Sequence, residues 1–172
     1  MNNDIMNCTY DNTPEFSLCG LLLQGRVLSL YDADTCKIAL PLSNVNTGIF
    51  YKFTCRLNGI DTPEIKPRKD KPNREQEIIW AKKARAELLR LVCEDSLSSN
   101  FDNLDIKKEE VNNILNKNKK IITVKCSEWD KYGRLLVELY NVNDNTKSFN
   151  DILVEKQLAV KYDGGAKVAQ WI

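Results

Sequence analysis

The chain of 172 residues contains no histidine. This absence excludes Ser–His and Cys–His nucleophilic catalysis and zinc sites built on histidine. A general base in this protein must therefore be a carboxylate, a lysine, a tyrosine or a hydroxide bound to a metal ion.

Long apolar runs are also missing. No stretch approaches the ~20 apolar residues that a membrane helix needs, and Met1 to Asp4 lack the basic start of a signal peptide. We therefore expect an intracellular, cytoplasmic protein that does not associate with membranes.

The six cysteines include no Cys-x-x-Cys pair. Their even number allows three disulfides, but Cys36, Cys55 and Cys126 lie inside apolar, strand-like runs. Reduced and mostly buried thiols are the favoured interpretation, and zinc is disfavoured.

A large excess of positive charge is absent too, because the chain has 25 basic and 24 acidic residues and its net charge is +1. A protein that coats polyanions would be far more basic, so positive charge for a nucleic acid must be local to a site. The length and the hydrophobic content of 42% suit one core. We expect a monomer with an N-terminal tail over 1–18 and one domain over 19–172.

Alternating and helical apolar patterns define the expected elements. They predict a helix over Asn73–Cys93, capped by Asn73, a helix from a cap at Asn150 to Leu158, and five strands: Leu21–Leu30, Thr35–Leu42, Ile49–Ile60, Ile121–Cys126 and Leu135–Tyr140. The order β-β-β-α-β-β-α favours an α+β fold, a five-stranded OB-like barrel capped by helices.

A polar insertion covers about 94–119 and has few large apolar residues. Ile106 to Leu115 could form a short helix. Since a loop of this length inside a compact domain is usually functional or mobile, one hypothesis is that it docks a protein partner.

The most informative run extends from Arg56 to Glu64. It begins as an apolar strand and ends in a turn stiffened by Pro63, so that Arg56, Asp61, Thr62 and Glu64 stand within nine residues. Alone, it could be an acidic turn after a strand. Its carboxylates suit a hard cation, and its guanidinium suits a phosphate.

Two further fragments complete the set. Asp32 and Asp34 fall in a predicted turn between strands, and the run Asp130-Lys131-Tyr132-Gly133-Arg134 connects two later strands. Each alone reads as an ordinary turn, but three such fragments on this strand pattern are hard to ascribe to coincidence. Arg134 adds a second planar fork that lysine cannot imitate.

In order, residue type and spacing, the three fragments resemble the staphylococcal (thermonuclease-like) nuclease family. The resemblance runs from about Gly25 to about Lys167 and carries no weight over about 94–119. It implies an OB-type barrel, with Ca²⁺ as the cofactor. The residues that it implies are the metal ligands Asp34, Asp61 and Thr62 (through its carbonyl), the catalytic residues Arg56, Glu64 and Arg134, and the substrate contacts Lys131, Tyr132, Tyr162 and Lys167.

These observations predict a calcium-dependent phosphodiesterase, an endonuclease acting on DNA or RNA, in which water attacks phosphorus and 3′-phosphate ends remain. The alternative is a non-catalytic OB-like module that binds single-stranded nucleic acid or a protein partner. Because every acidic and arginine position of the family pattern is filled, the sequence favours the enzyme. A basic loop over 66–71 could contact the nucleic acid backbone or could simply be solvated.

Overall fold

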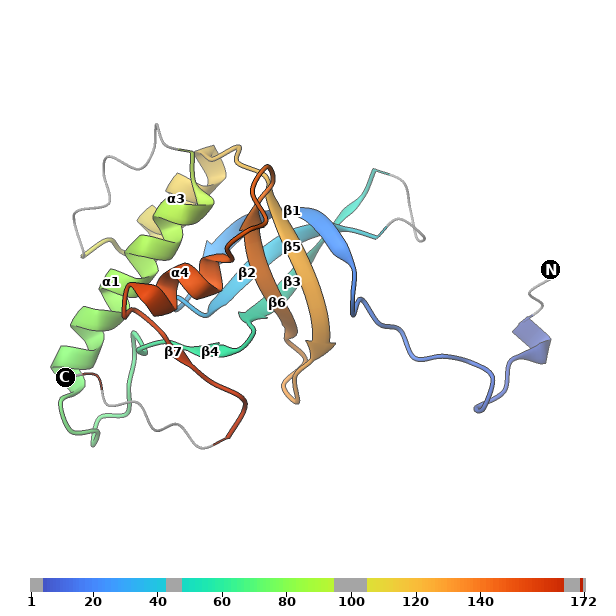
Figure 1. Ribbon diagram of the computed structural model, residues 1–172, viewed down its shortest axis with the longest axis horizontal. Helices are drawn as coiled ribbons and strands as arrows, with labels where there is room; N and C mark the ends of the chain where they lie inside the picture. The colour runs from blue at the N-terminus through green and yellow to red at the C-terminus, as the bar shows by residue number, and fades with distance from the viewer. Residues whose placement is uncertain (1–4, 43–47, 95–104, 166–170, 172) are drawn as a thin grey trace.

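A computed structural model describes residues 5–42, 48–94, 105–165 and 171. Its centre is a closed barrel whose strands lie in the order β1 (Leu22–Leu30), β2 (Thr35–Pro41), β3 (Phe50–Leu57), β6 (Leu135–Asn141) and β5 (Ile122–Trp129) (Figure 1). Neighbouring strands are antiparallel except β3 and β6, which are parallel. The predicted five-stranded OB-like α+β fold is confirmed.

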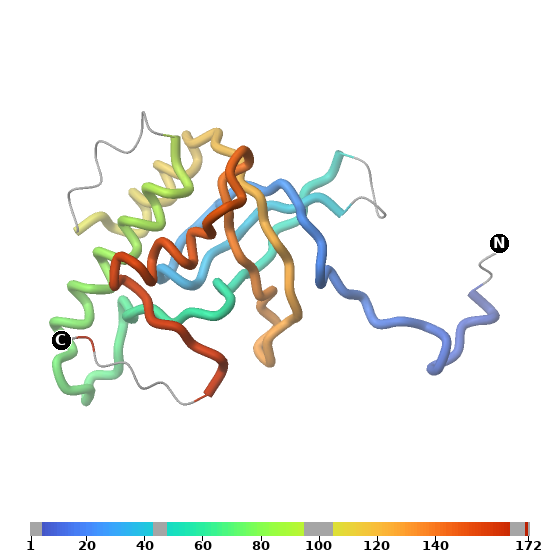
Figure 2. Tube along the Cα trace, in the orientation of Figure 1, coloured from blue at the N-terminus to red at the C-terminus, as the bar shows by residue number. Residues whose placement is uncertain are grey.

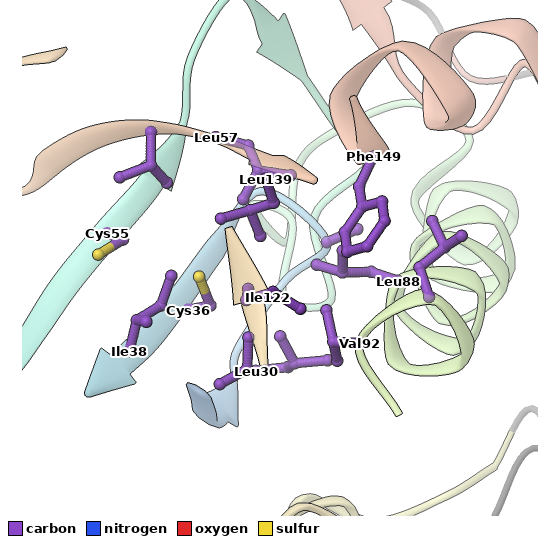
Figure 3. Close-up of a cluster of buried hydrophobic side chains, with 14 of the residues drawn as sticks. Leu30, Cys36, Ile38, Cys55, Leu57, Leu88, Val92, Ile122, Leu139 and Phe149 are labelled. Carbon is purple, nitrogen blue, oxygen red and sulfur yellow. The ribbon is translucent and has the colours of Figure 1, made fainter. Parts of the chain in front are cut away.

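The barrel core is made by the inward-facing half of each strand. In β2, Cys36, Ile38 and Leu40 are buried while Lys37 between them is exposed, as period-two alternation requires. Figure 3 shows side chains of the barrel meeting Leu88 and Val92 of the long helix and Phe149. All six thiols are free, and four of them are buried.

Three α-helices are described: α1 (Arg74–Val92), α3 (Lys108–Lys117) and α4 (Phe149–Glu155). Of the two predicted caps, Asn73 does occupy the N-cap position of α1, whereas the cap predicted at Asn150 was wrong. Asn73 precedes α1 but makes no side-chain capping bond and has a left-handed backbone, with φ 55°. Helix α4 is capped by Ser148, whose side chain accepts the N–H of Asp151, because Asn150 is buried and bonds to the carbonyls of Asn58 and Val137 instead.

The third predicted strand is divided in two. Gly59 adopts φ 73°, so β3 ends at Leu57 and a short strand β4 (Ile60–Asp61) follows. Strand β4 pairs antiparallel with β7 (Val160–Lys161), which the sequence analysis did not predict. This pairing brings the C-terminal part of the chain beside Asp61.

The segment after α1 is tied to the barrel. Val111 and Leu115 of α3 are buried, and the Arg26 guanidinium of β1 donates to the Leu115 carbonyl at 2.8 Å. The predicted short helix is thus present, over Lys108–Lys117. Residues 95–104 of the predicted insertion lie outside the described part of the chain.

The N-terminal segment behaves differently from the barrel. The segment begins with a 3₁₀ turn η1 (Ile5–Asn7) and lies away from the barrel (Figure 2). Every residue over 5–17 is exposed. Leu18 is the first buried side chain. Within the described residues, no helix combines the length and the apolar character needed to cross a membrane.

Candidate active site

Arg56 joins two carboxylates that come from separate segments. Its Nη1 lies 2.5 Å from Oδ2 of Asp34, in the β1–β2 turn, and its Nη2 lies 3.0 Å from Oδ1 of Asp61, in β4. The same Nη2 donates to the Ile60 carbonyl at 3.1 Å. Since one guanidinium reaches both carboxylates, the two aspartates predicted as ligands do converge.

The pair of aspartates lies in a nearly dry environment. Their side chains are only 6% and 5% exposed, and that of Arg56 is 12% exposed. Burial alone would lower the pKa of Arg56, but the charges and hydrogen bonds of Asp34 and Asp61 outweigh it and raise the pKa. Arg56 is therefore a fixed positive charge between two buried negative ones.

The donor atoms here suit a hard cation. Asp34 and Asp61 supply carboxylate oxygens, and Thr62 is buried with an Oγ1 that has no hydrogen-bond partner in the described structure. Ca²⁺ prefers such oxygen donors and completes its shell with carbonyls and water. Yet no three Asp, Glu, Cys or His side chains among the described residues form a cluster that could hold a metal ion. Asp34, Asp61 and Thr62 are thus of the right type to bind calcium. In this structure the positive group between the two aspartates is the Arg56 guanidinium.

Asp32 fixes the turn that carries Glu64. Its Oδ1 accepts the N–H of Ile65 at 2.9 Å. Burial raises the pKa of Asp32 to about 6; the negative charges of Asp34 and Glu64 also raise it, while the Ile65 N–H and the positive charge of Arg85 oppose the change. The Glu64 carboxylate therefore lies close enough to Asp32 for its charge to act on that side chain.

Glu77 of α1 is a residue that the sequence analysis missed. Its side chain is buried, its Oε1 accepts the N–H of Glu64 at 3.3 Å, and its Oε2 pairs with Nζ of Lys71 at 2.6 Å. Helix α1 was expected to pack and to do no chemistry, but this carboxylate holds both ends of the basic loop after Glu64. The sequence does contain a sign of its burial. Glu77 is four residues before Ala81 and so lies on the apolar face of the helix.

The β5–β6 connection presents Arg134. Gly133 adopts φ 76°, and Oδ1 of Asp130 accepts the N–H groups of Tyr132 and Arg134, both at 2.9 Å. Oδ2 of Asp130 accepts from Nε of Arg134 at 2.7 Å, so one carboxylate holds the backbone and the guanidinium together. Partial burial alone would raise the pKa of Asp130, but these contacts outweigh it and lower the pKa.

Thr35 links the two arginines. Its hydroxyl donates to Oδ1 of Asp34 at 2.9 Å and accepts a long bond of 3.5 Å from Nη1 of Arg134. Thr35 is also the register partner of Arg56 across β2 and β3. Two guanidinium groups and two carboxylates are therefore connected by direct contacts at one end of the barrel.

A family model of staphylococcal nuclease homologues matches residues 104–170. The chain contains a domain similar to these homologues. The matched stretch holds Arg134 and also α3, a region to which the sequence resemblance gave no weight. No curated protein matches the chain. The match covers less than half of the chain, so it shows a likeness of this stretch to the staphylococcal nuclease homologues.

The four residues expected to contact the substrate lie in different settings. Residue Tyr132 is 73% exposed, and the centre of its ring lies 5.2 Å from Nζ of Lys131 and 5.5 Å from the Arg134 guanidinium. Tyr162 instead places its ring 5.7 Å from the guanidinium of Arg56, and its hydroxyl donates to the Gly165 carbonyl. Lys167 lies outside the described residues.

Proposed function

We propose that the protein is a calcium-dependent phosphodiesterase that hydrolyses DNA or RNA. The observation that supports this most is the contact chain from Arg134 through Thr35 and Asp34 to Arg56 and Asp61. Two guanidinium groups can stabilise the negative charge that develops on phosphate oxygens in the transition state. The paired carboxylates beside them can bind a cation.

Asp34, Asp61 and the Thr62 carbonyl would hold the Ca²⁺ ion. When bound, the ion supplies Lewis-acid polarisation of the scissile phosphate. The protein's own part is to keep these oxygens converged in a nearly dry cluster, which the burial of both aspartates favours.

In this proposal Glu64 orients and deprotonates the attacking water. Two carboxylates hold its backbone. Glu77 accepts the N–H of Glu64, and Asp32 accepts the N–H of the following residue, Ile65. A base held this way keeps its place relative to the phosphate, and positioning is a large part of catalysis.

Arg56 and Arg134 stabilise the charge on the equatorial oxygens as water attacks phosphorus. Arg56 can offer its fork to a phosphate only once Asp34 and Asp61 have another cationic partner. Arg134 binds Asp130 through Nε, and among the described residues its outer nitrogen Nη1 makes only the long 3.5 Å hydrogen bond to Thr35. Following the family resemblance, the 5′-oxygen leaves and 3′-phosphate ends remain.

Digestion of single- and double-stranded DNA and of RNA, with Ca²⁺ or with EGTA, tests the proposal. We expect cleavage with Ca²⁺, none in EGTA, and a loss of ~10²-fold or more in turnover for Glu64→Gln. Exposed Glu75→Gln on α1 is the matched control. Undiminished cleavage in EGTA would remove the metal from the scheme, and full activity of Glu64→Gln would remove the base.

A second candidate is a non-catalytic OB-like module that binds single-stranded nucleic acid or a protein partner. The favouring observation is that Arg56 already satisfies both aspartates, while no acidic trio that could hold a metal ion forms among the described residues. Binding of an oligonucleotide without cleavage at any Ca²⁺ concentration would select this candidate. Docking of a partner through 94–119 remains a separate proposal.

A further inference from the structure

An open pocket of about 320 Å³ lies between the outer wall of the barrel and α3. It is lined by residues from β1, β2, β3 and α3, namely Leu28, Ser29, Lys37, Lys52, Lys108, Asn112 and Asn116. Three lysines, two carboxamides and a hydroxyl thus face a space of small-ligand size, and no carboxylate lines it.

The fold explains why these residues meet. Lys37 and Lys52 are at exposed, outward positions of strands that alternate with the core, and Ser29 is the register partner of Lys37 beside an irregularity in β1. Lys108, Asn112 and Asn116 are four residues apart and so share one face of α3. That helix is held on β1 by buried Val111 and Leu115 and by the bond from Arg26 to the Leu115 carbonyl.

The pocket has unused capacity for an anion. In the described part of the chain, Lys37, Lys52 and Lys108 form no ion pair. Oδ1 of Asn112 is buried without a partner there, and a carboxamide can turn to present its NH₂ group. Lys108 also opens α3, where helix dipoles favour negative charge.

The position of the pocket connects it to the candidate active site. On β3, Lys52, Thr54 and Arg56 alternate with the core and share the outer face, so Lys52 lies about 13 Å from Arg56 along the strand. On β2, Lys37 follows Thr35 on that face. This is the strand 2–3 face on which OB barrels bind oligonucleotides.

We propose that this pocket binds a backbone phosphate of a single-stranded nucleic acid whose scissile bond lies at Arg56 and Arg134. The inference rests on the proposed function and extends it to the substrate class. An open space of about 320 Å³ lined by three lysines is large enough for a phosphate group, and the neighbouring outer face of β2 and β3 is the one that suits a single strand. The ~13 Å between Arg56 and Lys52 is shorter than the stretch of ~4–16 nucleotides that an OB fold covers, so one bound strand can reach both places.

Fluorescence anisotropy with Ca²⁺ in a Glu64→Gln background, in which cleavage is slowed, tests the pocket separately from catalysis, and kcat is measured with Glu64 intact. The probes are a labelled single-stranded DNA 12-mer and a labelled dinucleotide. The test variant is Lys37→Gln/Lys52→Gln/Lys108→Gln. The control, Lys107→Gln/Lys117→Gln/Lys119→Gln, removes the same charge from exposed lysines beside the pocket that do not line it.

We expect the Kd of the 12-mer to rise about tenfold in the test variant and to change little in the control. Its salt slope should fall by about 2, since each single-strand phosphate contact contributes about 0.7. The dinucleotide Kd and the kcat on a dinucleotide should be unchanged, because a short substrate does not reach the pocket. A second pair, Asn116→Glu against the exposed, non-lining Asn113→Glu, should show the same contrast.

Equal losses of 12-mer affinity in test and control variants would overturn the inference while leaving the proposed function intact. Lysine-dependent binding to phosphatidylglycerol vesicles without binding to the 12-mer would overturn it in favour of a lipid surface. Wild-type protein that binds the 12-mer through the pocket but cleaves nothing with Ca²⁺ would support the pocket and reject the nuclease.

Discussion

Arg56 and Arg134 are the same residue type with the same expected role, but the fold places them in different settings. Arg56 is 12% exposed and is bound by two nearly buried carboxylates from distant segments. Arg134 is 25% exposed and is bound by Asp130 from its own hairpin, with one long contact to Thr35. The comparison indicates that Arg56 holds the structure together as well as serving chemistry, whereas Arg134 can be removed from a fold that stays intact.

The largest effect is expected for Arg56→Gln. Removing the guanidinium leaves Asp34 and Asp61 buried without their cation, which should lower the free energy of unfolding by about 3–5 kcal/mol. Turnover should fall by ~10²-fold or more. The measurement is urea unfolding with and without Ca²⁺. Ca²⁺ that binds the folded state should stabilise the variant more than wild type, because the variant has no guanidinium between the two aspartates. A variant as stable as wild type would break the comparison.

Arg134→Gln should separate activity from stability. We expect turnover to fall by ~10²-fold or more because a fork on the phosphate is lost, with a stability change below about 1 kcal/mol because the ion pair is partly solvated. Digestion assays and urea unfolding on the same preparation measure both. Exposed Arg68→Gln, paired with Asp70, is the matched control. A stability loss as large as that of Arg56→Gln would show that the two arginines do the same structural work.

The smallest effect is expected for Asp130→Asn, and it depends on pH. The folded-state pKa of Asp130 is lowered, so its stabilisation is fully present above the unfolded value of about 3.9 and is lost as the pH falls through the lower folded value. The variant should melt about 2–4 °C below wild type at pH 7, and the gap should close below about pH 4. Thermal unfolding from pH 3 to 8 is the measurement. A gap that is constant with pH would assign the effect to the turn backbone.

The sequence predicted the barrel well because buried residues alternate along most of each strand, and the buried residues of β2 follow that pattern throughout. It could not predict the break at Gly59, since a positive φ depends on where β4 finds its partner, and that partner is 100 residues later at Val160 and Lys161. The same limit explains Asn150. Its side chain could cap a helix, but it is buried and bonds to the carbonyls of Asn58 and Val137 instead.

For the candidate site, residue types and order were enough to name the two aspartates and both arginines, and the structure brings these four together. The contacts among them were beyond sequence reasoning, because Arg56 bridges carboxylates whose separation is set by three segments. Glu77 was missed for a similar reason. A glutamate in a helix is usually solvated, and only the packing of α1 against the turn after Asp61 buries it.

The short pairing of β4 with β7 also bears on how the protein is made. Asp61 and the ring beside Arg56 are brought together by residues 160–162, which leave the ribosome long after the barrel's first three strands. A nascent chain that has completed those strands still lacks the pairing of β4 with β7. The complete arrangement of Asp61, Arg56 and the Tyr162 ring therefore forms only after translation has passed Tyr162, so shorter nascent chains carry the acidic residues and Arg56 without that neighbour.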